Sequence, residues 1–318
     1  MKLGVMIEGQ EGLNWERWRH ITSLVEELGF ESQWRSDHLF PFGEEKARDS
    51  LEAWSSLVEL AARGARLTFG TLVSSMTFRH PSMLARQAAA VDALAPGRLV
   101  LGVGAGWNVG EHEAFGIALP PMRERMDRLE EGIRVIKALL TGDKVSCEGK
   151  YYSLKDAQMR PAPPPGRVRL LIGGGGEQRT LRMVARYADE WNMGGGNPDF
   201  YRQKLAVLER HCAAVKRDPS TIARSLMLSY VIGRNEAEVA QKVETARRTN
   251  PRLASVAPEE AAARMRAFGA LVGTPPAIVA QLKIWESLGV SRVMLHHLNQ
   301  TDDDSLRLIA AEVLPQVA

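Results

Sequence analysis

Four short stretches of the sequence combine residue types that suit a binding or catalytic site. The first is Ser36-Asp37-His38, where an imidazole beside a carboxylate can transfer a proton near neutral pH. A structural histidine, bonded to Asp37 and capping the following loop, explains an isolated Asp-His pair equally well. Because the pair follows a predicted strand, where the functional face of a barrel lies, its position favours a functional role for His38.

The second stretch, Leu101–Asn108, has glycines at positions 102, 104 and 106. Gly104 and Gly106 would let the backbone approach a flat ligand, with Trp107 as a wall. The stretch is not a dinucleotide fingerprint, because Trp107 occupies a position where that motif requires glycine. A tight turn that needs glycine for its backbone angles is an equally good interpretation.

The third stretch is Gly173-Gly174-Gly175-Gly176, which leads from a predicted strand into a helix. Backbone N–H groups in such a loop can surround an anion, and the helix dipole adds to the attraction. A Walker loop is excluded, since no Gly-Lys-Ser or Gly-Lys-Thr follows. An ordinary connection remains the alternative, but four glycines cost much backbone entropy, so we favour phosphate binding.

The fourth stretch, Gly70–Pro81, places Ser74, Arg79 and His80 after another predicted strand. These side chains could donate hydrogen bonds to a polar ring edge or to an anion. Alternatively, Arg79 and His80 cap the loop before a helix that starts at Pro81.

The elements that must position these stretches alternate between short apolar runs and longer segments of helical periodicity, a pattern typical of α/β proteins with a parallel sheet. The predicted strands are Lys2–Glu8, Phe30–Asp37, Leu67–Ser74, Arg98–Gly104, Val168–Ile172, Glu190–Met193, Ser225–Ile232 and Arg292–His297. The predicted helices are Trp15–Leu28, Ser50–Arg63, Ser82–Leu94, Arg123–Leu140, Gln178–Tyr187, Asp199–Lys216, Pro276–Leu288 and Ser305–Leu314. Eight such pairs predict an α/β fold of the (β/α)8 TIM-barrel class.

Two segments exceed what a plain barrel needs. Residues 144–166 carry a hairpin-like Gly149-Lys150-Tyr151-Tyr152 and then four prolines. Residues 235–269 are predicted as extra helix with a break at Pro251. We expect one domain over residues 1–318, with both insertions covering the C-terminal mouth of the barrel.

Composition narrows the class of protein. The 318 residues include 41 Lys and Arg and 38 Asp and Glu, which gives a formal charge of +3. Because the basic residues are not gathered in a tract, nucleic-acid binding is not expected. Two distant cysteines, Cys147 and Cys212, argue against a disulfide scaffold. Since no apolar run approaches membrane-spanning length and no leader is visible, we expect a cytoplasmic protein.

A metal site is the remaining option for the histidines. Its candidate ligands are His38, Glu111, His112, His296 and His297. Neighbouring residues of a strand point to opposite sides, so at most one of His296 and His297 faces the barrel axis. Because neither HxH nor HExxH occurs, we expect no metal.

Taken together, the motifs resemble the luciferase-like flavin monooxygenase superfamily, and within it the branch of oxidoreductases that depend on the deazaflavin F420. The resemblance rests on the order of Ser36-Asp37-His38, Gly70-Thr71 with Arg79-His80-Pro81, Leu101-Gly102 through Trp107, the glycine loop before Arg179-Thr180-Leu181, Ala188-Asp189-Glu190-Trp191-Asn192, and Gly273-Thr274-Pro275-Pro276. It covers nearly the whole chain.

The resemblance implies a barrel that binds F420, or alternatively FMN, at the C-terminal ends of its strands. It implies a non-proline cis peptide at Leu72–Val73, the polar edge of the ring near Ser74, and the phosphate on the loop Gly173–Gly176. His38 would handle the proton, with Glu111 as a second candidate. The remaining residues that it implies for the cofactor site are Asp37, Gly104, Gly106, Trp107 and Asn108.

The resemblance leaves several functions open. The first is hydride transfer between F420 and a small organic substrate, and the second is an FMN-dependent monooxygenase that uses oxygen and a separate reductase. A cofactor-free barrel hydrolase or aldolase, and a non-catalytic flavin-binding protein, are alternatives of other classes. Sugar-phosphate dehydrogenases of this branch carry Glu at the position of Trp107, so we expect a different substrate. The resemblance also implies a homodimer.

Overall fold

Eight parallel strands form a closed barrel in the computed structural model, which describes residues 1–42, 47–250 and 253–317. The barrel strands are β1 (Lys2–Ile7), β2 (Ser32–Arg35), β3 (Thr68–Thr71), β5 (Leu99–Gly104), β8 (Arg169–Gly173), β9 (Glu190–Gly194), β10 (Ala223–Ile232) and β12 (Arg292–His296). They pair in chain order, and pairing of β12 with β1 closes the ring. The predicted (β/α)8 TIM barrel is confirmed.

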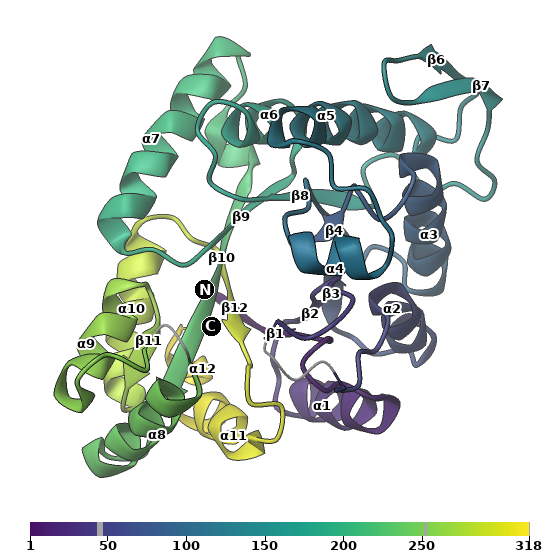
Figure 1. The fold of residues 1–318 in the computed structure, drawn as a ribbon. Coiled ribbons are helices and arrows are strands. Elements are labelled where there is room, and N and C mark those ends of the chain that lie inside the picture. The colour runs from purple at the N-terminus through teal and green to yellow at the C-terminus, as the bar shows by residue number, and fades with distance from the viewer. Residues whose placement is uncertain (43–46, 251–252, 318) are drawn as a thin grey trace.

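Helices form a ring around these strands (Figure 1). Their bounds are α1 (Trp15–Glu27), α2 (Ala53–Ala62), α3 (Pro81–Leu94), α5 (Met122–Leu139), α6 (Thr180–Tyr187), α7 (Pro198–Ala214), α10 (Pro275–Ser287), α11 (Asp303–Glu312) and α12 (Leu314–Val317). Gly29 and Gly289 follow α1 and α10 with φ of 79° and 78°, the left-handed conformation expected where each helix ends. No helix of the described residues is long and apolar enough to cross a membrane.

Smaller elements extend this plan. They are β4 (Ser74–Ser75), α4 (Val109–Ala114), β6 (Val145–Glu148), β7 (Ser153–Ala157), the 3-10 turn η1 (Pro219–Thr221), α8 (Glu236–Thr249), α9 (Pro258–Ala267) and β11 (Leu271–Gly273). Among them, β4 pairs with β5, and α4 follows β5, so both lie at the C-terminal ends of the barrel strands.

The first insertion does not cover the mouth of the barrel. It folds as the hairpin β6–β7, which lies outside the helix ring beside α3 and α5 (Figure 1). The Glu131 carboxylate on α5 accepts hydrogen bonds from the backbone N–H groups of Tyr151 and Tyr152, at 2.9 and 2.7 Å. The position follows from topology, because a segment that joins a helix to the next strand starts at the opposite end of a barrel from the mouth.

The second insertion forms a small layer of its own beside β10. Helices α8 and α9 pack on the outer part of β10 and on β11, whose strand was not predicted. The Phe268 carbonyl at the end of α9 accepts a hydrogen bond from Gly196, just after β9, so this insertion does reach the C-terminal rim. The predicted break at Pro251 lies outside the described residues.

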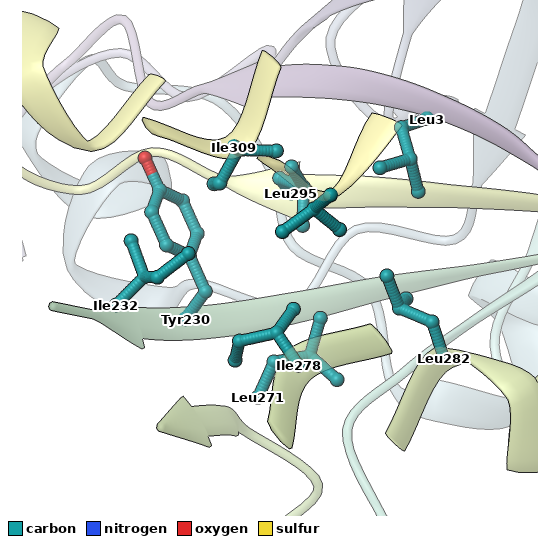
Figure 2. A pocket seen from close by; sticks show the side chains of 9 residues that line it. Leu3, Tyr230, Ile232, Leu271, Ile278, Leu282, Leu295 and Ile309 are labelled. Carbon is teal, nitrogen blue, oxygen red and sulfur yellow. The ribbon is translucent and has the colours of Figure 1, made fainter. Parts of the chain in front are cut away.

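The barrel interior is filled by side chains that alternate inward along the strands. Its central layer consists of Met6, Trp34, Val100, Leu171 and Met294. A second apolar layer joins the strands to the helices. The pocket in Figure 2 is part of that second layer, between β10, β12 and helices α10 and α11, and its lining is aliphatic except for Tyr230. It is a packing gap away from the strand ends that carry the predicted site.

A buried ion-pair network closes the N-terminal end of the barrel. Arg292 on β12 contacts Glu190 on β9 at 2.5 Å and Glu31 at 2.9 Å, and its guanidinium lies 5.5 Å from the centre of the Trp34 ring. Removing one partner of a buried pair leaves the other charge without compensation.

We therefore predict that Arg292→Met lowers the free energy of unfolding by about 3–5 kcal/mol. Urea denaturation followed by tryptophan fluorescence measures this loss. Lys2→Ala is the matched control, because Lys2 also contacts Glu31, at 3.4 Å, but is mostly exposed and should cost less than about 1 kcal/mol. Equal losses in the two variants would contradict a specific role for the buried network.

Candidate active site

His38 and Glu111, the two candidates for proton handling, lie in direct contact at the C-terminal mouth of the barrel. His38 follows β2, and Glu111 lies in the first turn of α4, whose N-cap Asn108 accepts a hydrogen bond from the Glu111 N–H at 3.4 Å. The Glu111 carboxylate is 1% exposed. One oxygen accepts from Nδ1 of His38 at 2.9 Å, and the other accepts from the Leu39 N–H at 3.0 Å.

This contact sets the protonation of His38. Burial by itself would lower the pKa of the imidazole, but the hydrogen bond and negative charge of Glu111 outweigh burial and raise it above the ordinary value of 6.5. Since Nδ1 is held by Glu111, Nε2 is the ring nitrogen that this contact leaves free. Among the described residues, Nε2 has no hydrogen-bond partner.

Two aromatic side chains flank the imidazole. The Phe42 ring lies 4.6 Å from the ring of His38, the Trp107 ring lies 5.6 Å from it, and both contacts are edge-on. Phe42 and Trp107 also contact each other at 5.4 Å. The structure thus places Trp107 beside His38, the residue predicted to handle the proton, on the side of the mouth formed by the loops after β2 and β5.

Asp37 does not bond to His38, as one interpretation of the Asp-His pair suggested. Its carboxylate binds the Arg79 guanidinium with both oxygens, and Arg79 also contacts Glu52 at 2.8 Å. Burial raises the pKa of Asp37 and outweighs the opposing effect of Arg79. His80 caps α3, where its Nδ1 accepts from the Ser82 N–H at 3.3 Å. The capping interpretation therefore holds for His80, while Arg79 neutralises Asp37.

The Leu72–Val73 peptide bond is cis, as the resemblance implied. Val73 packs against the predicted cofactor glycines of two neighbouring strands. A Cβ atom on Gly104 would lie 2.6 Å from Cγ2 of Val73, and one on Gly173 would lie 3.1 Å from its Cγ1. These glycines make room for Val73, so their first role is in packing.

Ser74 presents no free hydroxyl to a ligand. Its fully buried side chain accepts from the Trp54 indole N–H at 3.0 Å and donates to Thr71 at 3.1 Å. The contact with the ring's polar edge that the resemblance implied near Ser74 therefore stays a prediction, and the hydroxyl is already engaged within the protein.

Gly106 also has a structural reason to be glycine. Its φ is 76°, and a Cβ atom would lie 2.4 Å from the Ser75 hydroxyl. Ser75 continues a hydrogen-bond chain through Thr77 to Nε2 of His112, with steps of 2.6 and 2.7 Å. Arg125 donates to the Gly106 carbonyl, while its Nε is buried and has no hydrogen-bond partner among the residues that the structure describes. Ser75 on one side and Arg125 on the other therefore hold the turn before Trp107.

The glycine loop after β8 retains two N–H groups for an anion. Gly174 donates to the Asn192 carbonyl at 2.9 Å and is thereby occupied. Gly175 and Gly176 donate no hydrogen bond within the described part of the chain. Lys204 on α7 lies beside this loop, 3.9 Å from the position of a Cβ on Gly175, and contacts Glu177 at 2.8 Å. We missed Lys204 from the sequence because no local motif marks it.

A second carboxylate–imidazole pair lies at the mouth. Nε2 of His296, on β12, donates to Glu8 after β1 at 2.9 Å, and Gln10 donates to the other carboxylate oxygen at 2.7 Å. Burial would raise the pKa of Glu8, but the hydrogen bond and charge of His296, together with Gln10, lower it to about 2. The sequence patterns did not predict that Glu8 and His296 form a pair.

Strand alternation places His297 on the other side of β12. Its Nδ1 shares a 2.6 Å hydrogen bond with the Tyr230 hydroxyl, and burial lowers its pKa to about 4. Across residues 1–42, 47–250 and 253–317, no three His, Cys, Asp or Glu side chains come together as metal ligands.

Comparisons with known proteins agree on one family. A model of the luciferase-like monooxygenase family matches residues 1–292. The F420-dependent glucose-6-phosphate dehydrogenase of Microbacterium testaceum is 32% identical over 322 residues, which cover 92% of this chain and 91% of that protein.

Solved structures share the whole fold. An F420-dependent secondary alcohol dehydrogenase in complex with an F420-acetone adduct has a TM-score of 0.82 at 19% identity, with 100% of this chain and 99% of that chain covered. A monooxygenase from Streptomyces bottropensis also has a TM-score of 0.82, at 23% identity, and both chains are covered completely. Because both identities are below 25%, these two structures show that the fold is shared and nothing more.

The packing role of the glycines around Val73 can be tested without a cofactor. We predict that Gly104→Ala lowers the free energy of unfolding by about 1–3 kcal/mol, because the new methyl group overlaps Val73. Gly194→Ala is the control, since its Cβ would meet only Met227, at 3.4 Å. If chemical denaturation shows the same stability for both variants, Gly104 is not required for packing.

Proposed function

Because the chain belongs to the luciferase-like monooxygenase family, we propose that its mouth binds F420 and that His38 exchanges the proton that accompanies hydride transfer. The chain is an F420-dependent oxidoreductase that transfers a hydride between the deazaflavin and a small organic substrate. The resemblance drawn from the sequence motifs is thereby confirmed. The observation that supports the role of His38 is the Glu111 contact, which occupies Nδ1 and leaves Nε2 without a hydrogen-bond partner among the described residues.

The described residues fit a deazaflavin with an anionic side chain. Val73, with Gly104 and Gly173 beside it, offers a surface without projecting side chains for a flat ring. Gly175 and Gly176 offer N–H groups that no described residue accepts from, and Lys204 adds positive charge next to them for a phosphate. We therefore assign the ring to the Leu72–Val73 side of the mouth and the phosphate to the glycine loop.

The residues of the mouth provide orientation, proton transfer and shielding. F420, when bound, supplies a ring carbon that accepts or returns a hydride. Glu111 holds the His38 ring by Nδ1, so Nε2 accepts a proton when a substrate is oxidised and returns it in the reverse direction. Phe42 and Trp107 pack edge-on against the His38 ring and supply apolar surface beside it.

The alternatives carry less support. An FMN-dependent monooxygenase rests on likeness of fold to structures below 25% identity, one of them in complex with FMN, whereas a sequence relative at 32% identity is named for F420. Membership of the family argues against a cofactor-free hydrolase or aldolase, and the polarised His38 argues against a protein that only stores flavin.

Assembly and location are further parts of the proposal. We propose a homodimer, which the resemblance implies; the exposed apolar side chains Val58 on α2 and Met83 and Leu94 on α3 are available for such an interface. We also propose that residues 1–318 act as one domain in the cytoplasm, where a separate oxidoreductase regenerates the F420 that this enzyme uses.

Cofactor choice is tested by fluorescence titration of the purified protein with F420 and with FMN. We predict at least a tenfold preference for F420, equivalent to about 1.4 kcal/mol. Gly175→Asp should weaken F420 binding, because it places a negative charge at the phosphate loop. Gly175→Ala is the control, since its Cβ would meet nothing closer than 3.4 Å. Unchanged affinity in Gly175→Asp would remove this loop from the site.

The proton role of His38 predicts a pH profile. Substrate oxidation needs neutral Nε2, so kcat/KM should rise with pH through the raised pKa of His38, and its midpoint should lie above 6.5. Substrate reduction should show the opposite dependence and fall over the same range. Glu111→Gln should move both midpoints downward, because it removes the negative charge that raises the pKa.

His38→Ala completes this test. It should bind F420 with an affinity within about twofold of the original but lose about 100-fold or more in the rate of hydride transfer, the usual range for a general acid–base group. An unchanged single-turnover rate in His38→Ala would refute the assignment.

A further inference from the structure

A cavity of about 200 Å³ lies beside the N-terminal ends of the barrel strands, away from the mouth. Its lining comes from β5, from the starts of β8 and β9, from the C-terminal end of α5, and from the segment that joins the hairpin β6–β7 to β8. Because an apolar cavity of about 150 Å³ is large enough to hold benzene, this cavity has room for a small organic molecule.

Apolar side chains form the inner wall of the cavity. Leu101 on β5, Ile136 on α5 and Leu170 on β8 line it, and all three are buried. Val168, just before β8, and Leu140, which ends α5, continue the same wall. Such a wall stabilises the hydrocarbon part of a ligand and contributes little to the binding of a bare inorganic ion.

The outer wall comes from the first insertion, which has no role at the mouth. Pro165 and Gly166 line the cavity. The next residue, Arg167, pairs with the fully buried carboxylate of Asp92 through Nε and one terminal nitrogen, at 2.7 and 2.6 Å. The Arg167 N–H also donates to the Pro164 carbonyl at 3.1 Å. Since this segment is already fastened, a ligand would not have to order it.

Arg169, at the start of β8, is a half-buried cation that lines the cavity. Its guanidinium carries five N–H donors and makes no hydrogen bond or ion pair with the residues that the structure describes. Two other charged groups of the cavity are engaged. Asp189 accepts from the Leu170 N–H at 2.8 Å, and Lys137 donates to the Tyr187 carbonyl at 3.1 Å.

The charges of the cavity favour an anion. Arg169 and Lys137 supply two positive charges against the one negative charge of Asp189. The carbonyl end of α5 adds about half a negative charge, so the sum stays positive. A guanidinium binds a carboxylate through two parallel hydrogen bonds, which is the geometry that the free donors of Arg169 can supply.

We propose that this cavity is a second binding site, which takes a small carboxylate with a compact apolar body, such as an aromatic carboxylic acid. The carboxylate pairs with Arg169, and the hydrocarbon part covers Leu101, Ile136 and Leu170. Arg169 and Gly173 are the two ends of β8, about 13 Å apart, so the site is separate from the glycine loop. The inference goes beyond the proposed function and does not depend on it.

The first test titrates the full chain, labelled on its methyl groups, with benzoate and follows the protein by NMR. We expect a Kd of about 1 mM or below and a shift of the Ile136 methyl signal, which the variant Ile136→Val assigns. Benzamide keeps the ring without the charge, and inorganic phosphate keeps the charge without the ring. Each should bind at least about tenfold more weakly.

Either comparison can overturn the proposal. If phosphate binds as tightly as benzoate, the apolar wall contributes nothing. If benzamide binds as tightly as benzoate, Arg169 contributes nothing. An unshifted Ile136 signal at saturating benzoate would place the ligand elsewhere.

The second test changes the cation. Arg169→Met should weaken benzoate binding at least about tenfold, because an apolar side chain of similar length replaces the guanidinium. Arg169→Lys keeps the charge but loses the paired donors, so its affinity should lie between those of Arg169→Met and the original. Arg134→Met is the matched control, since Arg134 is an exposed arginine on α5 that does not line the cavity. Equal affinity in Arg169→Met and the original protein would refute the site.

The third test changes the volume and leaves every charge in place. Leu140→Phe places a larger side chain at the cavity and should weaken benzoate binding at least about tenfold. Unchanged affinity in a folded Leu140→Phe protein would contradict the proposal. This variant also decides the question if the Arg169 variants fold poorly.

A final titration separates this cavity from the mouth. With saturating F420 present, the Kd for benzoate should stay within about twofold. Displacement of benzoate by F420 would place benzoate in the mouth and overturn the proposal. Failure of the protein to bind F420 would instead refute the proposed function, and the first three tests would still decide the second site.

Discussion

The Glu111 carboxylate is the constraint on which the rest of the site depends. One oxygen holds His38 and the other holds the backbone of Leu39, so a single buried group joins the loop after β2 to α4 after β5. It occupies Nδ1 of the imidazole, leaves Nε2 for the proposed ligand and raises the pKa of that imidazole. Because Phe42 and Trp107 belong to the same two loops, the apolar walls of the mouth depend on the same carboxylate.

The barrel brings together loops that are far apart in the chain. Parallel strands bring His38, Val73 and the glycine loop to one end, although they are far apart in the chain. Glycines at 104 and 173 leave space for Val73 between neighbouring strands, so the residues that make this packing possible are also those to which we assign the flat ring. Charged groups at the opposite end, centred on Arg292, close the barrel interior there.

Local sequence patterns predicted the strands, the helices and the stretches at the strand ends, because each depends on residues close together in the chain. They also placed His38 and Glu111 in one site by resemblance. Pairs formed by closure of the barrel were not predictable in this way: Glu8 and His296 are 288 residues apart. The same holds for Arg79 with Asp37 and for Lys204 beside Gly175. The hairpin β6–β7 was misplaced over the mouth, since its sequence does not say which end of the barrel it leaves.

The central claim is that Glu111 holds the His38 imidazole by Nδ1 and makes it a stronger base. NMR titration of ring-labelled histidine, with His38→Gln used to assign the signal, measures both parts in the cofactor-free protein. The account predicts a pKa above 6.5 for His38 and a neutral form that keeps its proton on Nδ1. A pKa at or below 6.5, or a neutral form protonated on Nε2, would contradict it.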